Sequence, residues 1–142
     1  MPITPNSILA LDVGAKRVGV AIASLEARLP RPLTTLMRDD SLVSRLKTII
    51  ETEHVSRLVV GLPRGLEGQT TEQTGAIEAF VTELKQDFKL PIVMQDEAVT
   101  SKLAEAELQT RGKTYQNGDI DALAATYILD DFLKAERERV TS

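Results

Sequence analysis

Three carboxylates that lie far apart in the chain are the side chains best suited to chemistry: Asp12, Glu97 and Asp121. Asp12 ends an apolar run that is typical of a buried strand, where a carboxylate costs several kcal/mol unless something pairs with it. A few carboxylates, together with phosphate and water, bind magnesium. Two such ions can hold both the attacking and the leaving oxygen of a phosphodiester. The three acids therefore suggest a metal site for phosphate chemistry.

Each acid also has a structural explanation. Asp12 could bond to the backbone of its own turn, Glu97 could be a solvated loop residue, and Asp121 could offset the dipole at a helix N-terminus. Asp96 stands beside Glu97 and could be the inward-facing ligand instead. The residues alone leave these alternatives open.

The residue types that are missing narrow the choice of metal. The chain has no cysteine and one histidine, His54, which excludes disulfides, thiolate zinc sites and multi-histidine sites. His54 is expected at the end of a helix, where a cation is favoured. Any metal would therefore be bound by oxygen, which indicates Mg²⁺ or Mn²⁺.

Four basic side chains are predicted to contact phosphate or to guide a nucleic-acid strand: Lys16, Arg17, Arg64 and Lys102. The first two follow Asp12 in a short turn and offer a point charge and a planar fork. The alternative is ordinary surface charge. Five bases stand against one acid between residues 13 and 38, whereas six acids face three bases from residue 119 onward. A basic segment beside acidic ligands suits a metal-dependent enzyme that acts on a polyanion.

The elements that must position these residues follow from hydrophobic periodicity. Apolar runs predict strands over 7–13, 18–24, 33–36, 58–61 and 91–94. Helical spacing and capping residues predict helices over 41–53, 70–88, 100–111 and 119–133, with Ser41, Thr70 and Asp119 as three of the caps. The short link 14–17 predicts a hairpin, and right-handed crossovers then place the first strand in the centre of a mixed sheet of order 3-2-1-4-5.

This α/β sheet, with helices on both faces, would bring the candidate residues to one edge. Sites in such sheets form beyond the carboxyl ends of the parallel strands. Asp12 ends the first strand, a glycine-rich loop follows the fourth, and Asp96 and Glu97 follow the fifth. We therefore expect them to open on the same edge.

Size and composition predict one soluble domain over residues 1–142. The 142 residues are 42% hydrophobic and 27% charged, and no run is long enough to span a bilayer. The chain shows no secretion signal, so a cytoplasmic location is expected. The net charge of −4 and the pI of about 5.1 are unusual for a protein that binds duplexes, and aromatic residues, at 4%, are too few for extended base stacking.

Four ordered blocks resemble the YqgF (RuvX) family of Holliday-junction resolvases and pre-ribosomal-RNA nucleases: Leu11–Ala21, Val60–Pro63 with Gly68, Asp96–Glu97 before Thr100, and Asp121–Ala125. The resemblance covers about Ser7 to Leu133. It implies an RNase H-like fold, a bacterial cytoplasmic protein and divalent-metal nuclease chemistry, with Asp12, Glu97 and Asp121 as metal ligands. Two positions depart from the family pattern, which usually has Arg where Ala98 stands and a basic stretch where residues 115–119 stand. Both departures bear on the affinity for nucleic acid.

The leading interpretation is an endonuclease that depends on Mg²⁺ or Mn²⁺ and cleaves structured nucleic acid, with processing of pre-16S rRNA ends favoured on family grounds. One alternative is a Holliday junction resolvase, which needs a symmetric dimer; the sequence allows a monomer or a homodimer. Another is a catalytically weak nucleic-acid-binding module, which Ala98 and the acidic pI favour. An actin-like or sugar-kinase-like ATPase would need a second lobe that a chain of this size does not supply.

Overall fold

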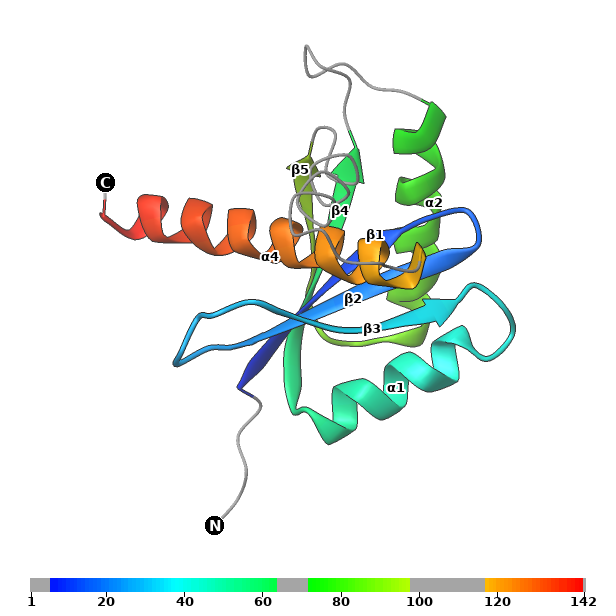
Figure 1. Cartoon of the computed structure of the whole chain (residues 1–142), viewed down its shortest axis with the longest axis horizontal. Coiled ribbons are helices and arrows are strands. Elements are labelled where there is room, and N and C mark those ends of the chain that lie inside the picture. Colours follow the sequence, from blue (N-terminus) through cyan, green and yellow to red (C-terminus); the bar gives the residue numbers. More distant parts are fainter. Residues whose placement is uncertain (1–5, 64–71, 98–116, 142) are drawn as a thin grey trace.

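The computed structural model describes residues 6–63, 72–97 and 117–141. In chain order (Figure 1), the elements are β1 (Ser7–Val13), β2 (Arg17–Ser24), β3 (Arg31–Met37), α1 (Leu42–Thr52), β4 (Val55–Pro63), α2 (Glu72–Asp87), β5 (Ile92–Glu97) and α4 (Asn117–Thr141). The helix predicted over 100–111 and the cap at Thr70 lie outside the described residues. None of the described helices is both long and apolar enough to cross a membrane.

The five strands form one mixed sheet in the order β3-β2-β1-β4-β5. The strand β1 pairs antiparallel with β2 and parallel with β4. The strand β3 pairs antiparallel with β2, and β5 pairs parallel with β4. The predicted sheet order is confirmed. The hairpin and the right-handed crossovers leave few other strand orders.

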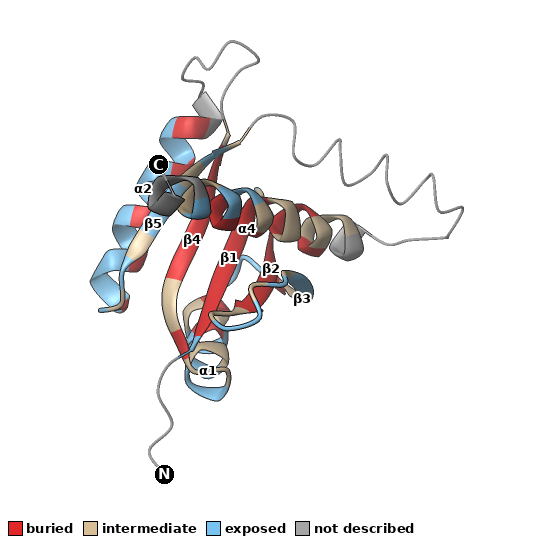
Figure 2. Ribbon diagram, turned by 90° about the vertical axis from the view of Figure 1, so that its left-hand side faces the viewer, coloured by how far each residue is buried: buried red, intermediate tan, exposed pale blue. Residues whose placement is uncertain are grey.

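Helices cover both faces of the sheet, as predicted. On one face, α1 and α2 pack on the odd-numbered residues of β1, such as Leu9 and Leu11. On the other face, α4 packs on the even-numbered residues Ile8 and Ala10 and lies across the strands (Figure 2). The period of two along a strand separates these two cores.

The face under α4 is lined by small residues: Ala10, Gly19, Ala21, Ala23 and Gly61. The opposite face carries the larger Leu, Ile and Val side chains. Small residues let a helix backbone lie close to a sheet. The positioning of α4 therefore depends on this difference between the two faces.

Three local predictions were wrong in detail. The strand β3 begins at Arg31 and includes Pro32, which an edge strand tolerates. Ser41 occupies the N-cap position of α1 but makes no side-chain cap bond; instead, the Asp39 carboxylate accepts the Ser41 backbone N–H at 2.8 Å. The helix α4 begins at Asn117, two residues before the predicted cap, because packing as well as capping decides where a helix ends.

Candidate active site

Asp12 lies on the face of the sheet that α4 covers, between two glycine positions. It pairs with Gly19 on β2, and Gly61 follows Val60, the β4 partner of Leu11. Neither glycine has a side chain, so both leave room for α4 to lie over the carboxylate. Asp12 is therefore half-buried under the helix rather than exposed in its own turn.

The glycines set how closely α4 approaches. A Cβ added at Gly19 would overlap the backbone carbonyl of Asp121 and lie 2.9 Å from the nitrogen of Ala122. A Cβ added at Gly61 would overlap the end of the Ile128 side chain. The lack of a side chain at Gly19 thus lets the main chain of α4 pack directly on β2, and this close packing brings Asp121 near Asp12.

The Asp12 carboxylate is held in an unfavourable electrostatic environment. Burial, and then the charge of Asp121, raise the pKa of Asp12 from 3.8 to about 6. Asp121 itself accepts a hydrogen bond from Nε of Arg17 at 2.7 Å. Arg17, predicted as a phosphate contact, therefore forms an ion pair with one of the predicted metal ligands.

The pleat of β5 separates Asp96 from Glu97. The strand was predicted to end at Met94, but it continues through Glu97, so these two neighbours point to opposite faces. Asp96 is exposed, whereas Glu97 is half-buried and its Oε1 atom is buried without a hydrogen-bond partner. Burial above all, and in part the charge of Asp12, raise the pKa of Glu97.

A fourth acid, Asp131, meets Glu97 from α4. Burial first, then hydrogen bonding to Asp131 and the charges of Asp131 and Asp12, raise the pKa of Glu97 well above its usual value. Two carboxyl groups can share a hydrogen bond only when one of them holds a proton. Sequence reasoning missed Asp131; the signal that could have found it is its position three residues after Ile128, on a neighbouring part of the same helical face.

The donor set fits a divalent cation in its chemistry. The interactions run pairwise from Asp121 to Asp12, from Asp12 to Glu97, and from Glu97 to Asp131. Within the described ranges, no three acidic, His or Cys side chains form a ready-made group for one ion. The buried, unpartnered oxygen of Glu97 and the raised pKa of Asp12 nevertheless suit oxygen ligands of a cation.

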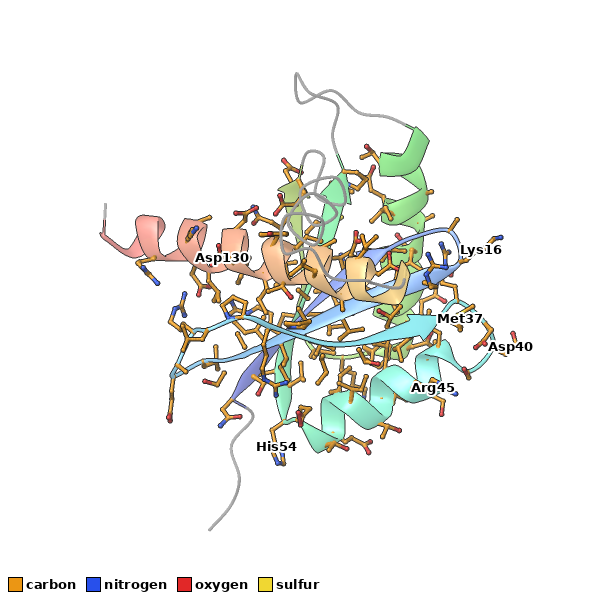
Figure 3. All side chains as sticks on the ribbon, viewed as in Figure 1. Lys16, Met37, Asp40, Arg45, His54 and Asp130 are labelled. Carbon is orange, nitrogen blue, oxygen red and sulfur yellow. The ribbon has the colours of Figure 1, made fainter. Side chains whose placement is uncertain are left out.

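The remaining predicted residues divide into two groups. Lys16 is exposed at the turn between β1 and β2 (Figure 3), beside Arg17. Arg64, Lys102 and the departure at Ala98 lie outside the described residues. The structure thus brings Asp12, Asp121, Glu97 and Arg17 into one region.

Comparisons with solved structures agree with this fold. Solved structures of Thermus thermophilus RuvC are similar, with a TM-score of 0.51 at 14% identity over 92% of this chain and 96% of that chain. A second structure, of the same protein with a Holliday junction substrate, gives a TM-score of 0.50 at 15% identity over the same shares. The sheet order and these neighbours define an RNase H-like domain, and the predicted fold is confirmed.

The family follows from the sequence comparisons. The profile of the family RuvX, described as Holliday junction resolvase, matches residues 6–135. A protein of Chloroflexus aggregans is 38% identical over 136 residues, which cover 93% of this chain and 96% of that protein. One of Rickettsia felis is 34% identical over 139 residues, with 94% and 90% covered. Both are provisionally named pre-16S rRNA nuclease. This chain belongs to the RuvX family, as its motifs predicted.

Proposed function

We propose that this protein is a metal-dependent endonuclease that cleaves phosphodiester bonds of structured nucleic acid in the bacterial cytoplasm, with residues 1–142 acting as one domain. The observation that carries the proposal is the half-buried Asp12 carboxylate, placed between two glycines under α4 and within the electrostatic reach of Asp121 and Glu97. Membership of the RuvX family supports it.

Asp12, Glu97 and Asp121 would hold Mg²⁺ or Mn²⁺. When bound, the ion supplies an activated water and stabilises charge on the phosphate oxygens. The carboxylates must be ionised to bind it, so Asp12 and Glu97 must each be free of a proton. Their partial burial strengthens the electrostatic interactions of the site.

Arg17 and Lys16 would contact the substrate phosphate. Arg17 bonds to Asp121 through Nε, and a guanidinium has five N–H donors, so its two Nη groups can serve a phosphate oxygen while the ion pair holds the fork in place. Lys16, exposed in the same turn, adds a point charge. Arg64 and Lys102 are proposed to guide the strand at the same edge.

The proposed substrate is the precursor of 16S rRNA, because the relatives carry that name. The second candidate is a branched DNA junction, which the family description and the RuvC complex favour. A resolvase needs two symmetric sites, so the oligomeric state separates the candidates.

The test is cleavage of a panel of structured RNAs and four-way DNA junctions with Mn²⁺, comparing wild type with Asp12→Asn. We expect Asp12→Asn to lose at least about 100-fold in rate, as expected for a group that acts in the transition state. Glu51→Gln, which changes an exposed acid on α1, is the matched control and should cleave like wild type. Equal activity in wild type and Asp12→Asn would reject the proposal, and so would binding of these substrates without any cleavage. Cleavage of junctions alone by a dimer would move the substrate to DNA.

A further inference from the structure

Arg38 lies at the end of β3, beside the turn that follows Asp12. We infer that Arg38 forms a further phosphate-binding contact for the nucleic acid, beside Lys16, on the α2 side of the sheet edge and opposite Asp121. The inference rests on the proposed function for the class of its ligand, an RNA or DNA backbone. It adds a contact on the far side of β1 from the acids.

Two bonds join Arg38 to the turn between β1 and β2. Its backbone N–H donates to the carbonyl of Lys16 at 2.9 Å, and its Nη1 donates to the carbonyl of Gly14 at 3.0 Å. The turn is itself closed by a bond from the Gly14 N–H to the carbonyl of Arg17 at 2.8 Å. Arg38 is therefore attached two residues from Asp12, and its cation has a defined place relative to the candidate active site.

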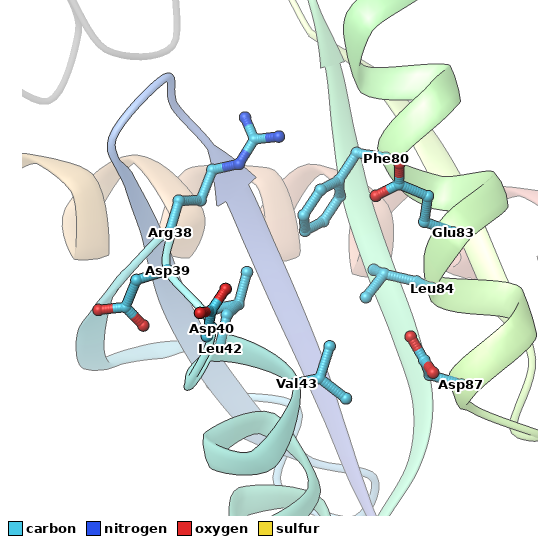
Figure 4. A pocket seen from close by; sticks show the side chains of 9 residues that line it. All are labelled: Arg38, Asp39, Asp40, Leu42, Val43, Phe80, Glu83, Leu84 and Asp87. Carbon is cyan, nitrogen blue, oxygen red and sulfur yellow. The ribbon is translucent and has the colours of Figure 1, made fainter.

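The guanidinium of Arg38 is also held from one side. It lies over the ring of Phe80, with 5.0 Å from Cζ to the ring centroid, and Figure 4 shows the side chain extending past the end of β1 toward that ring. Phe80 is buried on α2, so the platform is rigid. A side chain that is already ordered loses less entropy when a ligand binds.

Within the described part of the chain Arg38 forms no ion pair with a carboxylate, which distinguishes it from three other arginines. Arg17, Arg28 and Arg57 each form an ion pair at 2.7 to 3.1 Å. The neighbouring Asp39 instead accepts bonds from the N–H and hydroxyl of Ser41. Arg38 is thus an exposed cation that is fixed by neutral groups, and a phosphate is the bidentate anion that a guanidinium suits.

Acidic residues limit where the nucleic acid can run from this point. Arg38 lines one end of a pocket of about 300 Å³ between the start of α1 and the helix α2, and four carboxylates line it too: Asp39, Asp40, Glu83 and Asp87 (Figure 4). A polyanion is repelled from such a pocket. The backbone therefore passes along the turn, over Lys16 and Arg38, and does not continue between α1 and α2.

The test measures binding without cleavage. A labelled RNA stem-loop and a four-way DNA junction are titrated in EDTA at several salt concentrations between about 50 and 200 mM, with wild type, Arg38→Gln and Arg38→Lys. Arg31→Gln is the matched control, because Arg31 lies at the other end of the same strand and is also exposed. We expect Arg38→Gln to bind several-fold more weakly and to reduce the slope of log K against log[salt] by about one. Arg38→Lys should keep the slope, and Arg31→Gln should keep both.

Equal loss in Arg38→Gln and Arg31→Gln would overturn the inference, because general charge would then explain binding. An unchanged slope in Arg38→Gln would overturn it as well. The rise in unfolding temperature that Mn²⁺ causes tests whether the acidic residues keep their arrangement. This rise should be the same in Arg38→Gln and wild type. Its loss in Arg38→Gln would mean that the variant distorts the turn, and would overturn the inference.

Failure of the nuclease proposal gives a different result. If wild type cleaves nothing with Mn²⁺ while Arg38→Gln still loses one phosphate contact, the nuclease fails and the phosphate site stands. If wild type cleaves but Arg38→Gln binds as tightly as wild type, the phosphate site fails and the nuclease stands.

Discussion

The two halves of α4 pack on the same sheet but in opposite electrostatic settings. In the second half, Glu136 accepts hydrogen bonds from Arg28 at 3.1 Å and Arg57 at 2.8 Å, and Arg57 lies over the ring of Phe132. Burial opposes ionisation there, but the two arginines hold the pKa of Glu136 below its usual value. The charge of Glu136 is thus compensated, whereas Asp131, earlier in the same half, faces Glu97 at the site.

The charges near the first half of the helix are less well compensated. Asp121 forms one ion pair, with Arg17. Burial and the charge of Asp121 raise the pKa of the neighbouring Asp12 carboxylate. A fold with marginal stability keeps such uncompensated groups only where the surroundings hold them in place. The comparison indicates that the stretch around Glu136 fixes α4 on the sheet, whereas the stretch from Asp121 to Asp131 serves the site.

Of the variants considered, Gly19→Ala should have the largest effect on the first half of α4. The new Cβ would meet the main chain of Asp121, which has no flexible end to move, so the first half of α4 must shift. We expect a loss of about 1–3 kcal/mol in the free energy of unfolding, as for overpacking. Cleavage should fall about 10- to 100-fold, because the acids are displaced. Urea unfolding and initial cleavage rates measure the two effects.

Two other glycines are the controls for this variant. Gly61→Ala meets only the end of the Ile128 side chain, which can change its conformation, and Gly75→Ala meets nothing within 4 Å. We expect a smaller loss of stability in the first and a slight gain in the second, because alanine is favoured in a helix. A Gly19→Ala protein that cleaves like Gly75→Ala would contradict the proposed role of Gly19 in positioning α4.

Asp12→Asn sharpens the comparison through pH. Between 3.8 and about 6 the folded protein binds more protons at Asp12 than the unfolded chain does, so this group lowers stability as pH rises through that window. A shift of about two pKa units corresponds to at most about 3 kcal/mol. We therefore expect Asp12→Asn to be more stable than wild type by about 1–3 kcal/mol at about pH 8, and nearly equal at about pH 4, without metal.

Urea unfolding in EDTA at the two pH values measures this difference. Mn²⁺ should then stabilise wild type and leave Asp12→Asn unchanged, because a ligand stabilises only the state that binds it. If Asp12→Asn is the less stable protein at the higher pH, the carboxylate makes favourable interactions in the folded state. That result would contradict the unfavourable electrostatic environment described for Asp12.

The sequence indicated the framework of the site better than its contacts. A carboxylate at the end of an apolar strand was enough to single out Asp12, and the hairpin with two crossovers was enough for the sheet order. The orientation of Glu97 depended on β5 continuing past Met94, which the local pattern did not reveal. The Arg17–Asp121 pair joins residues 104 positions apart, and the bonds of Arg38 depend on where β3 ends. Such contacts follow from register and helix packing, which periodicity alone does not determine.

Glu136→Gln probes the second half of α4 and should have the smallest effect. Its two ion pairs involve side chains that are 28% to 35% exposed, and each such pair is worth roughly 0.2–1 kcal/mol. We expect a total loss of about 1 kcal/mol in the free energy of unfolding, and less at about 1 M salt, because salt screens the pairs. Lys134→Gln, which removes an exposed pair with Asp130, is the control and should not change stability measurably. Cleavage with Mn²⁺ should be unchanged in both variants. A loss of cleavage in Glu136→Gln at a temperature where the protein remains folded would mean that the halves of the helix are coupled, and that the second half does more than anchor it.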